Sequence, residues 1–210
     1  MNSNNLEKEK ILTSFKEKKF QEVIVEGEKL FKQRQNDAQL IYLLGLSSIK
    51  LKNFDDAENY FNKLILFNKS AENFYVLGNI QKKLKKFDNA IISFEKAVKI
   101  NPNFTEAYNN LGSTQKSLNK YQEAITNYKK AISLKKNNLE AHYNLASLYF
   151  LLENYVEAID HYKNIINSEA RHEEICEKYT ICLFKTGKTI EIKDFVSTII
   201  SKYSKNRTLN

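Results

Sequence analysis

One spacing recurs along the whole chain. The stretches FDNAIISFEKAV at 87–98 and YQEAITNYKKAI at 121–132 place an aromatic residue, an alanine and a second aromatic residue at the same intervals. The leading position recurs at steps of 34, 33, 34, 34 and 34 residues, as Phe20, Phe54, Phe87, Tyr121, Tyr155 and Thr189. A fixed period of this length is typical of small structural units that bury their apolar faces against their neighbours. The sequence therefore predicts a repeat array.

Each repeat contains two helical patterns. The first half carries a mostly apolar residue, a leucine and a small residue: Ile41, Leu44 and Gly45; Phe74, Leu77 and Gly78; Tyr108, Leu111 and Gly112; His142, Leu145 and Ala146. The second half pairs an alanine with an aromatic residue four places later: Ala57 and Phe61, Ala90 and Phe94, Ala124 and Tyr128, Ala158 and Tyr162. Steps of three and four share one helix face, so each unit is predicted to be a helix, a tight turn and a helix. Small residues such as Gly78 and Ala90 would let the two helices approach closely.

These motifs resemble the tetratricopeptide repeat, whose signature is W-x2-L-G-x2-Y, then A-x3-F, then P. The tryptophan is replaced here, and the proline survives only as Pro102. The resemblance implies an all-α, right-handed α-solenoid of antiparallel helix pairs with a concave groove. We expect four units at 38–70, 71–104, 105–138 and 139–172, a degenerate helix pair at 1–37, a capping pair at 173–205 and a frayed tail at 206–210.

The charge of the chain is strongly positive, with a formal net charge of +8. Nearly all basic residues are lysines, since arginine occurs only at Arg34, Arg171 and Arg207. Two explanations stay open, an acidic partner and a compositional bias of the source. The amino-terminal sequence lacks the apolar region of a signal peptide, and the longest apolar stretch is too short to cross a bilayer. We therefore expect a cytoplasmic protein without membrane insertion.

Residues that could support catalysis are sparse. The three histidines, His142, His161 and His172, lack metal-ligand spacing, and the glycines are isolated, so no phosphate-binding loop is evident. Cys176 and Cys182 are six apart and would lie on different faces of a helix. We expect no enzyme activity, no cofactor, no metal and no small-molecule substrate.

Binding is the better-supported function. In the tetratricopeptide family the first helix of each unit lines the concave groove, where we expect an extended peptide to bind. The candidate residues are Tyr42, Tyr75, Asn79, Lys82, Lys83, Asn109, Asn110, Lys116, Tyr143, Asn144 and Phe150. An asparagine amide both donates and accepts, so Asn110 and Asn144, one repeat apart, could hold a peptide backbone of any sequence. The lysines favour an acidic partner, and Phe150 favours an apolar anchor in that partner. Alternatively, the asparagines only follow the repeat consensus, and the lysines only form a solvated face.

Helical repeat arrays of this kind also suggest three other functions. A chaperone-type carboxylate clamp would use Asn79 and Asn110, but Tyr75, Glu140 and Asn144 stand where the clamp needs two lysines and an arginine, so no clamp is expected. Similar arrays serve as recognition regions of glycosyltransferase- or sulfotransferase-like enzymes, which is the main alternative. RNA binding, as in pentatricopeptide arrays, is less favoured because arginine is scarce and the Ala-x3-Phe/Tyr motif is present.

Overall fold

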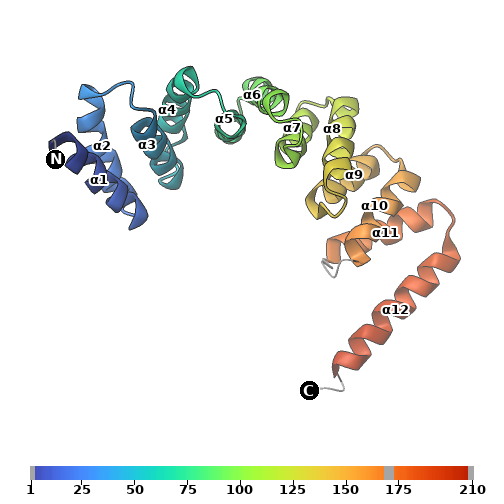
Figure 1. Ribbon diagram of the computed structural model, residues 1–210. Helices are drawn as coiled ribbons and strands as arrows, with labels where there is room; N and C mark the ends of the chain where they lie inside the picture. The colour runs from blue at the N-terminus through green and yellow to red at the C-terminus, as the bar shows by residue number, and fades with distance from the viewer. Residues whose placement is uncertain (1–2, 168–172, 208–210) are drawn as a thin grey trace. The chain divides into compact units, whose positions relative to one another are not determined.

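The computed structural model describes residues 3–167 and 173–207, with side chains described for 6–167 and 173–198. All regular structure in this part of the chain is α-helical (Figure 1). The helices are α1 (Ser3–Lys16), α2 (Phe20–Gln33), α3 (Ala38–Lys50), α4 (Phe54–Phe67), α5 (Ala71–Lys83), α6 (Phe87–Ile100), α7 (Thr105–Ser117), α8 (Tyr121–Leu134), α9 (Leu139–Leu151), α10 (Tyr155–Asn167), α11 (Glu173–Lys185) and α12 (Thr189–Arg207). The predicted all-α solenoid of helix hairpins is confirmed.

The turn inside each hairpin has one backbone conformation. A residue in the left-handed region ends the first helix: Lys18, Lys52, Lys85, Asn119, Glu153 and Gly187, with φ between 57° and 71°. At Lys85 the next amide, that of Lys86, donates to the Gln81 carbonyl at 2.8 Å, which satisfies a carbonyl of the last helical turn. Only Gly187 adopts this conformation without a Cβ clash, which costs other residues about 1–2 kcal/mol.

Close packing of the two helices of a hairpin follows the small-residue pattern. A Cβ added to Gly78 would lie 2.7 Å from a carbon of the Phe94 ring, and one added to Gly45 would lie 2.8 Å from the Phe61 ring. Both rings are fully buried, as is the alanine that precedes each of them by four residues. The predicted role of the glycines is therefore confirmed, because a larger residue would collide with the ring that fills the hairpin.

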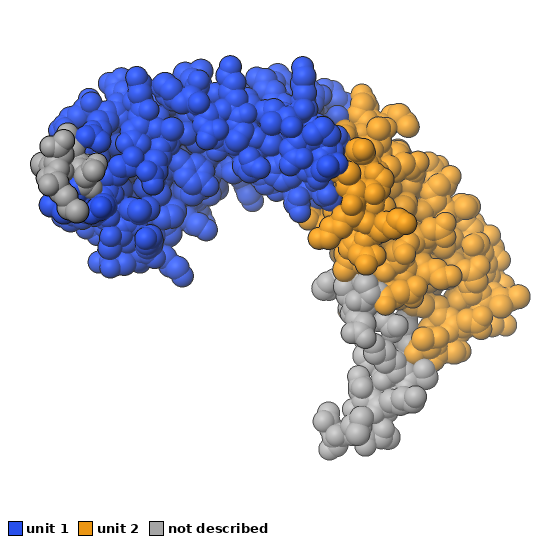
Figure 2. Space-filling view, in the orientation of Figure 1, with its two compact units in different colours: residues 1–120 blue, residues 121–210 orange. Residues whose placement is uncertain are grey.

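The structure divides into two compact units, Met1–Lys120 and Tyr121–Asn210, coloured separately in Figure 2. Unit 1 contains α1 to α7, and its largest apolar cluster includes Leu40, Leu44 and Phe61. Unit 2 contains α8 to α12, and its cluster includes Tyr128 and Tyr162. The division separates α7 from α8, which the sequence assigns to one repeat.

A buried polar network fixes three helices of unit 1 against one another. Glu58 of α4 is only 8% exposed and accepts hydrogen bonds from Gln81 of α5 and from Lys86. Ser93 of α6 donates to the Gln81 side-chain oxygen at 2.7 Å. Because each buried group has a partner, the network holds α5, which carries candidate groove residues, in one register.

At the carboxyl end, α12 continues to Arg207, into the segment predicted as a frayed tail. The remainder of that tail, 208–210, lies outside the described residues, as do Arg171 and His172 at the predicted boundary at 172. Within the described ranges, no helix is both long and apolar enough to cross a membrane.

Candidate functional site

Three of the candidate residues in unit 1 form a hydrogen-bonded ladder between two first helices, α5 and α7. The side-chain nitrogen of Asn110 donates to the Asn79 side-chain oxygen at 2.7 Å and to the Tyr75 hydroxyl oxygen at 3.2 Å. Tyr75 and Asn79 are four apart on α5, so one face of that helix meets Asn110. The Tyr75 ring rests on Phe104 and Phe94, with centroid distances of 4.8 and 5.9 Å. We call Tyr75, Asn79 and Asn110 the amide ladder.

The amide ladder keeps hydrogen-bonding capacity for a ligand. Both N–H groups of Asn110 are used inside the ladder, which leaves its carbonyl oxygen as an acceptor. The Tyr75 hydroxyl accepts from Asn110 and keeps its own proton to donate, and Asn79 keeps its amide N–H groups. All three side chains are half-buried. The ladder therefore offers both donors and an acceptor to a ligand.

Basic side chains lie at the carboxyl ends of the same two helices. Lys82 is half-buried and donates to the Ser113 hydroxyl of α7 at 2.8 Å, whereas Lys83 is exposed. Lys116 lies in the last turn of α7 and is half-buried. Lysines at a helix carboxyl terminus also stabilise the helix by up to about 1 kcal/mol through their interaction with the helix dipole. Their position therefore has a structural explanation as well as a binding one.

In unit 2, the predicted apolar anchor surface is covered by a lysine. Tyr143 and Phe150 are seven apart on α9 and share a face, and the Lys178 ammonium of α11 lies 5.9 Å from the centroid of each ring. Glu174 accepts from Lys178 at 2.6 Å and from the Tyr143 hydroxyl at 3.1 Å. We call these four residues the aromatic clamp. A partner's apolar side chain would have to displace Lys178 to reach the rings.

The remaining candidates differ in exposure. Tyr42 is 40% exposed, and its ring packs edge-on against Phe61 at 6.0 Å. Asn144 is half-buried. Asn109 is only 2% exposed, so its expected projection into the groove is wrong for this structure. Tyrosine occupies the equivalent place in the other three repeats, as Tyr42, Tyr75 and Tyr143, and its side chain is longer than that of asparagine.

A histidine pair is the contact that sequence spacing did not reveal. The Nδ1 atoms of His142 and His161 are 2.9 Å apart, and His142 Nε2–H donates to the Lys136 carbonyl at 2.9 Å. His142 Nδ1 is then an acceptor, so His161 donates to it. Burial, and then the neighbouring His142, lower the pKa of His161 to about 4. No group of three or more metal-ligating side chains occurs in the described residues, so this pair stands alone.

Comparison with known proteins gives the family. A family model described as the tetratricopeptide repeat protein 21 C-terminal ARM domain matches residues 1–178. The chain belongs to this tetratricopeptide-repeat family. None of the curated proteins compared with it matches the chain.

Solved structures similar to this tetratricopeptide-repeat chain share its fold. MamA is 23% identical with a TM-score of 0.72, over 81% of this chain and 96% of MamA. YrrB, described as a TPR protein with an unusual peptide-binding site, is 20% identical with a TM-score of 0.72, over 80% of this chain and 87% of YrrB. PilF of Pseudomonas aeruginosa is 15% identical with a TM-score of 0.72, over 93% of this chain and 87% of PilF. At these identities the likeness shows the fold alone.

The partners of the candidate residues that sequence reasoning missed lie outside the strong repeats or are common polar residues. Lys178 and Glu174 belong to α11, in the predicted capping pair, where the repeat signature is too degenerate to align. Ser113 is a common polar residue of α7, and its bond to Lys82 follows only from the distance between α5 and α7. Helix pairing in this tetratricopeptide-repeat chain thus decides which polar groups meet.

Proposed function

We propose that this chain is a non-catalytic protein-interaction scaffold that binds an extended peptide segment along the amide ladder of α5 and α7. The carrying observation is the bonding of Asn110 to both Asn79 and Tyr75. It orients the three side chains before a ligand arrives, so less side-chain entropy is lost on binding. The free donors and acceptor of the ladder suit a peptide backbone whatever its side chains.

The partner peptide is proposed to be acidic on the side that meets α5 and α7. Lys82, Lys83 and Lys116 lie on the same two helices as the ladder, and Lys82 and Lys83 share the last turn of α5. Carboxylates opposite lysines speed association and fix orientation more than they add affinity. The apolar anchor stays part of the proposal for unit 2, where it would replace Lys178 over Phe150. A cytoplasmic site of action stays a prediction from the sequence.

The test begins with peptides selected from a random display library on the intact chain. Binding of the selected peptides is then measured by fluorescence anisotropy for wild type and for Asn110→Ala. The variant removes an acceptor and releases two ladder residues, so the affinity should fall about tenfold, equal to about 1.4 kcal/mol. Asn89→Ala, an exposed asparagine of α6, is the matched control and should bind normally.

A second variant tests the acidic partner. Lys82→Glu combined with Lys83→Glu should lower the affinity for acidic peptides. It should also reduce the dependence of that affinity on salt, because fewer ionic contacts remain to be screened.

Equal binding of the selected peptides by wild type and by Asn110→Ala would rule out the amide ladder as the site. Binding of single-stranded RNA that persists at physiological salt would instead favour the nucleic-acid function.

A further inference from the structure

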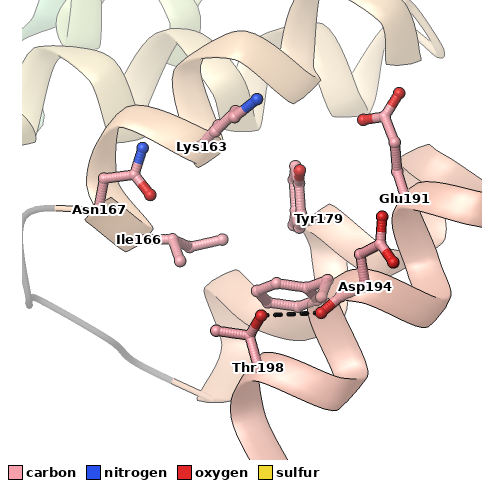
Figure 3. Close-up of a pocket in the computed structure, with 8 residues that line it drawn as sticks. Lys163, Ile166, Asn167, Tyr179, Glu191, Asp194 and Thr198 are labelled. Atoms are coloured by element: carbon pink, nitrogen blue, oxygen red, sulfur yellow. Dashed lines mark hydrogen bonds between the residues drawn. The ribbon is translucent and has the colours of Figure 1, made fainter.

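A cavity of about 290 Å³ lies in unit 2 among α10, α11 and α12, and none of its lining residues belongs to the amide ladder or the aromatic clamp. Figure 3 shows the lining side chains: Lys163, Ile166 and Asn167 of α10, Tyr179 of α11, and Glu191, Asp194, Phe195 and Thr198 of α12. This volume lies at the lower end of the range for ligand pockets, about 300–1,000 Å³, and is large enough for one long side chain.

Three of the lining residues, Ile166, Tyr179 and Phe195, give the cavity an apolar part. The rings of Tyr179 and Phe195 pack edge to face at 4.9 Å, and Ile166 is 5% exposed. Tyr179 is only 6% exposed, yet its hydroxyl has no hydrogen-bond partner in the described part of the chain. Figure 3 shows this hydroxyl directed toward the side of the cavity where Lys163 and Glu191 lie. Because no side chain of the described residues pairs with this hydroxyl and it faces the cavity, it is available to bond with a ligand atom.

Carboxylates dominate the charge near this hydroxyl. Burial raises the pKa of Tyr179, and the carboxylates of Glu191 and Asp160 raise it further. Glu191 is paired with Lys188 at 3.3 Å, whereas Asp194 is exposed and makes no ion pair among the described side chains. Lys163 is the opposing charge, but it is exposed and its flexible stem can point its ammonium into solvent.

We propose that this cavity binds the guanidinium group of an arginine side chain from a partner protein. Arginine has five N–H donors and no acceptor, which suits the Tyr179 hydroxyl oxygen together with the carboxylates of Asp194 and Glu191. Its planar group packs on aromatic rings, here those of Tyr179 and Phe195, and its apolar stem would lie against Ile166. The site is independent of the peptide function proposed for the amide ladder.

The test titrates the intact chain with the tripeptide amide acetyl-Gly-Arg-Gly and follows backbone amide shifts by NMR. Matched probes replace arginine by norleucine, which keeps an apolar stem, or by glutamate. The arginine probe should shift amides of α11 and α12 and bind at least about tenfold more tightly than the norleucine probe.

Three variants separate the contributions. Tyr179→Phe keeps the ring and removes the hydroxyl, and Asp194→Asn removes an exposed charge; each should weaken the arginine probe about fivefold, the size of one partly exposed ion pair or hydrogen bond. Lys163→Met should strengthen it, because a competing positive charge is lost. Tyr108→Phe makes the same chemical change at a half-buried tyrosine of α7, outside the cavity, and should have no effect.

Two results would overturn the assignment. If the norleucine probe binds as tightly as the arginine probe, or neither binds, the cavity does not recognise a cation. If the glutamate probe binds best and Lys163→Met abolishes its binding, the site takes an anion. Because Asp194 is exposed, Asp194→Asn should fold normally, so the proposal stays testable even if Tyr179→Phe unfolds.

Discussion

Gly78→Ala tests the contact on which both the hairpin and the amide ladder depend. The added Cβ would lie 2.7 to 2.9 Å from three carbons of the Phe94 ring, whereas ordinary contact begins at 3.4 Å. The ring must therefore retreat by about 0.7 Å, and it is fully buried in a close-packed interior that resists such a shift. Overpacking of this kind costs about 1–3 kcal/mol.

A second effect of Gly78→Ala has the opposite sign. Alanine is the better helix former by about 1 kcal/mol, and position 78 lies inside α5. The net expectation is a loss of about 1 kcal/mol in the free energy of unfolding, measured by urea denaturation followed by circular dichroism. Because Phe94 supports the Tyr75 ring, the affinity of ladder-binding peptides should fall as well.

Phe94→Leu provides the double-mutant cycle. A smaller side chain leaves room for the new methyl group, so Gly78→Ala should cost about 1 kcal/mol less in the Phe94→Leu background than alone. If Gly78→Ala stabilises the wild-type chain by about 1 kcal/mol, helix propensity alone acts and the steric argument is refuted. Equal effects in both backgrounds would show that Phe94 is not the residue in contact.

Three further predictions concern stability and charge. Gly187→Ala should destabilise the chain by about 1 kcal/mol in urea denaturation, purely through its φ of +71°, since nothing lies within 4 Å of the new Cβ. Lys85→Gly should instead stabilise the chain, because Lys85 also has a positive φ, which glycine adopts without strain. If both substitutions change the free energy of unfolding in the same direction, the conformational argument is wrong. His161 has a folded pKa of about 4 against about 6.5 when unfolded. The unfolded chain therefore gains a proton first, and stability should be lost as the pH falls from about 6.5 to about 4. In His161→Gln that part of the pH dependence should disappear from thermal melts, and a slope equal to wild type would exclude His161 as its source.

Most of the fold could be predicted because the spacing of residues within each repeat specifies its helices and turns. The steps of three, four and about 34 residues place apolar residues on helix faces that can be buried only by stacking, so helices, turns and the glycine-ring contacts follow from spacing alone. The burial and the partners of individual side chains were harder to predict. Asn109 was expected in the groove with its neighbour Asn110. Asn109 is buried, however, whereas Asn110 bonds across to Asn79 of α5.

The sequence by itself determined a repeat array of helical hairpins with a basic character and few residues suited to catalysis. Only the tertiary structure decided which polar groups meet. Asn110 bonds to Asn79, and Lys178 covers Phe150, across residues that are about one repeat apart. The histidine pair joins the two helices of one hairpin. Periodicity sets the face of a helix on which a residue lies, but the partner across that face depends on the distance and angle between helices, which many packed side chains set together.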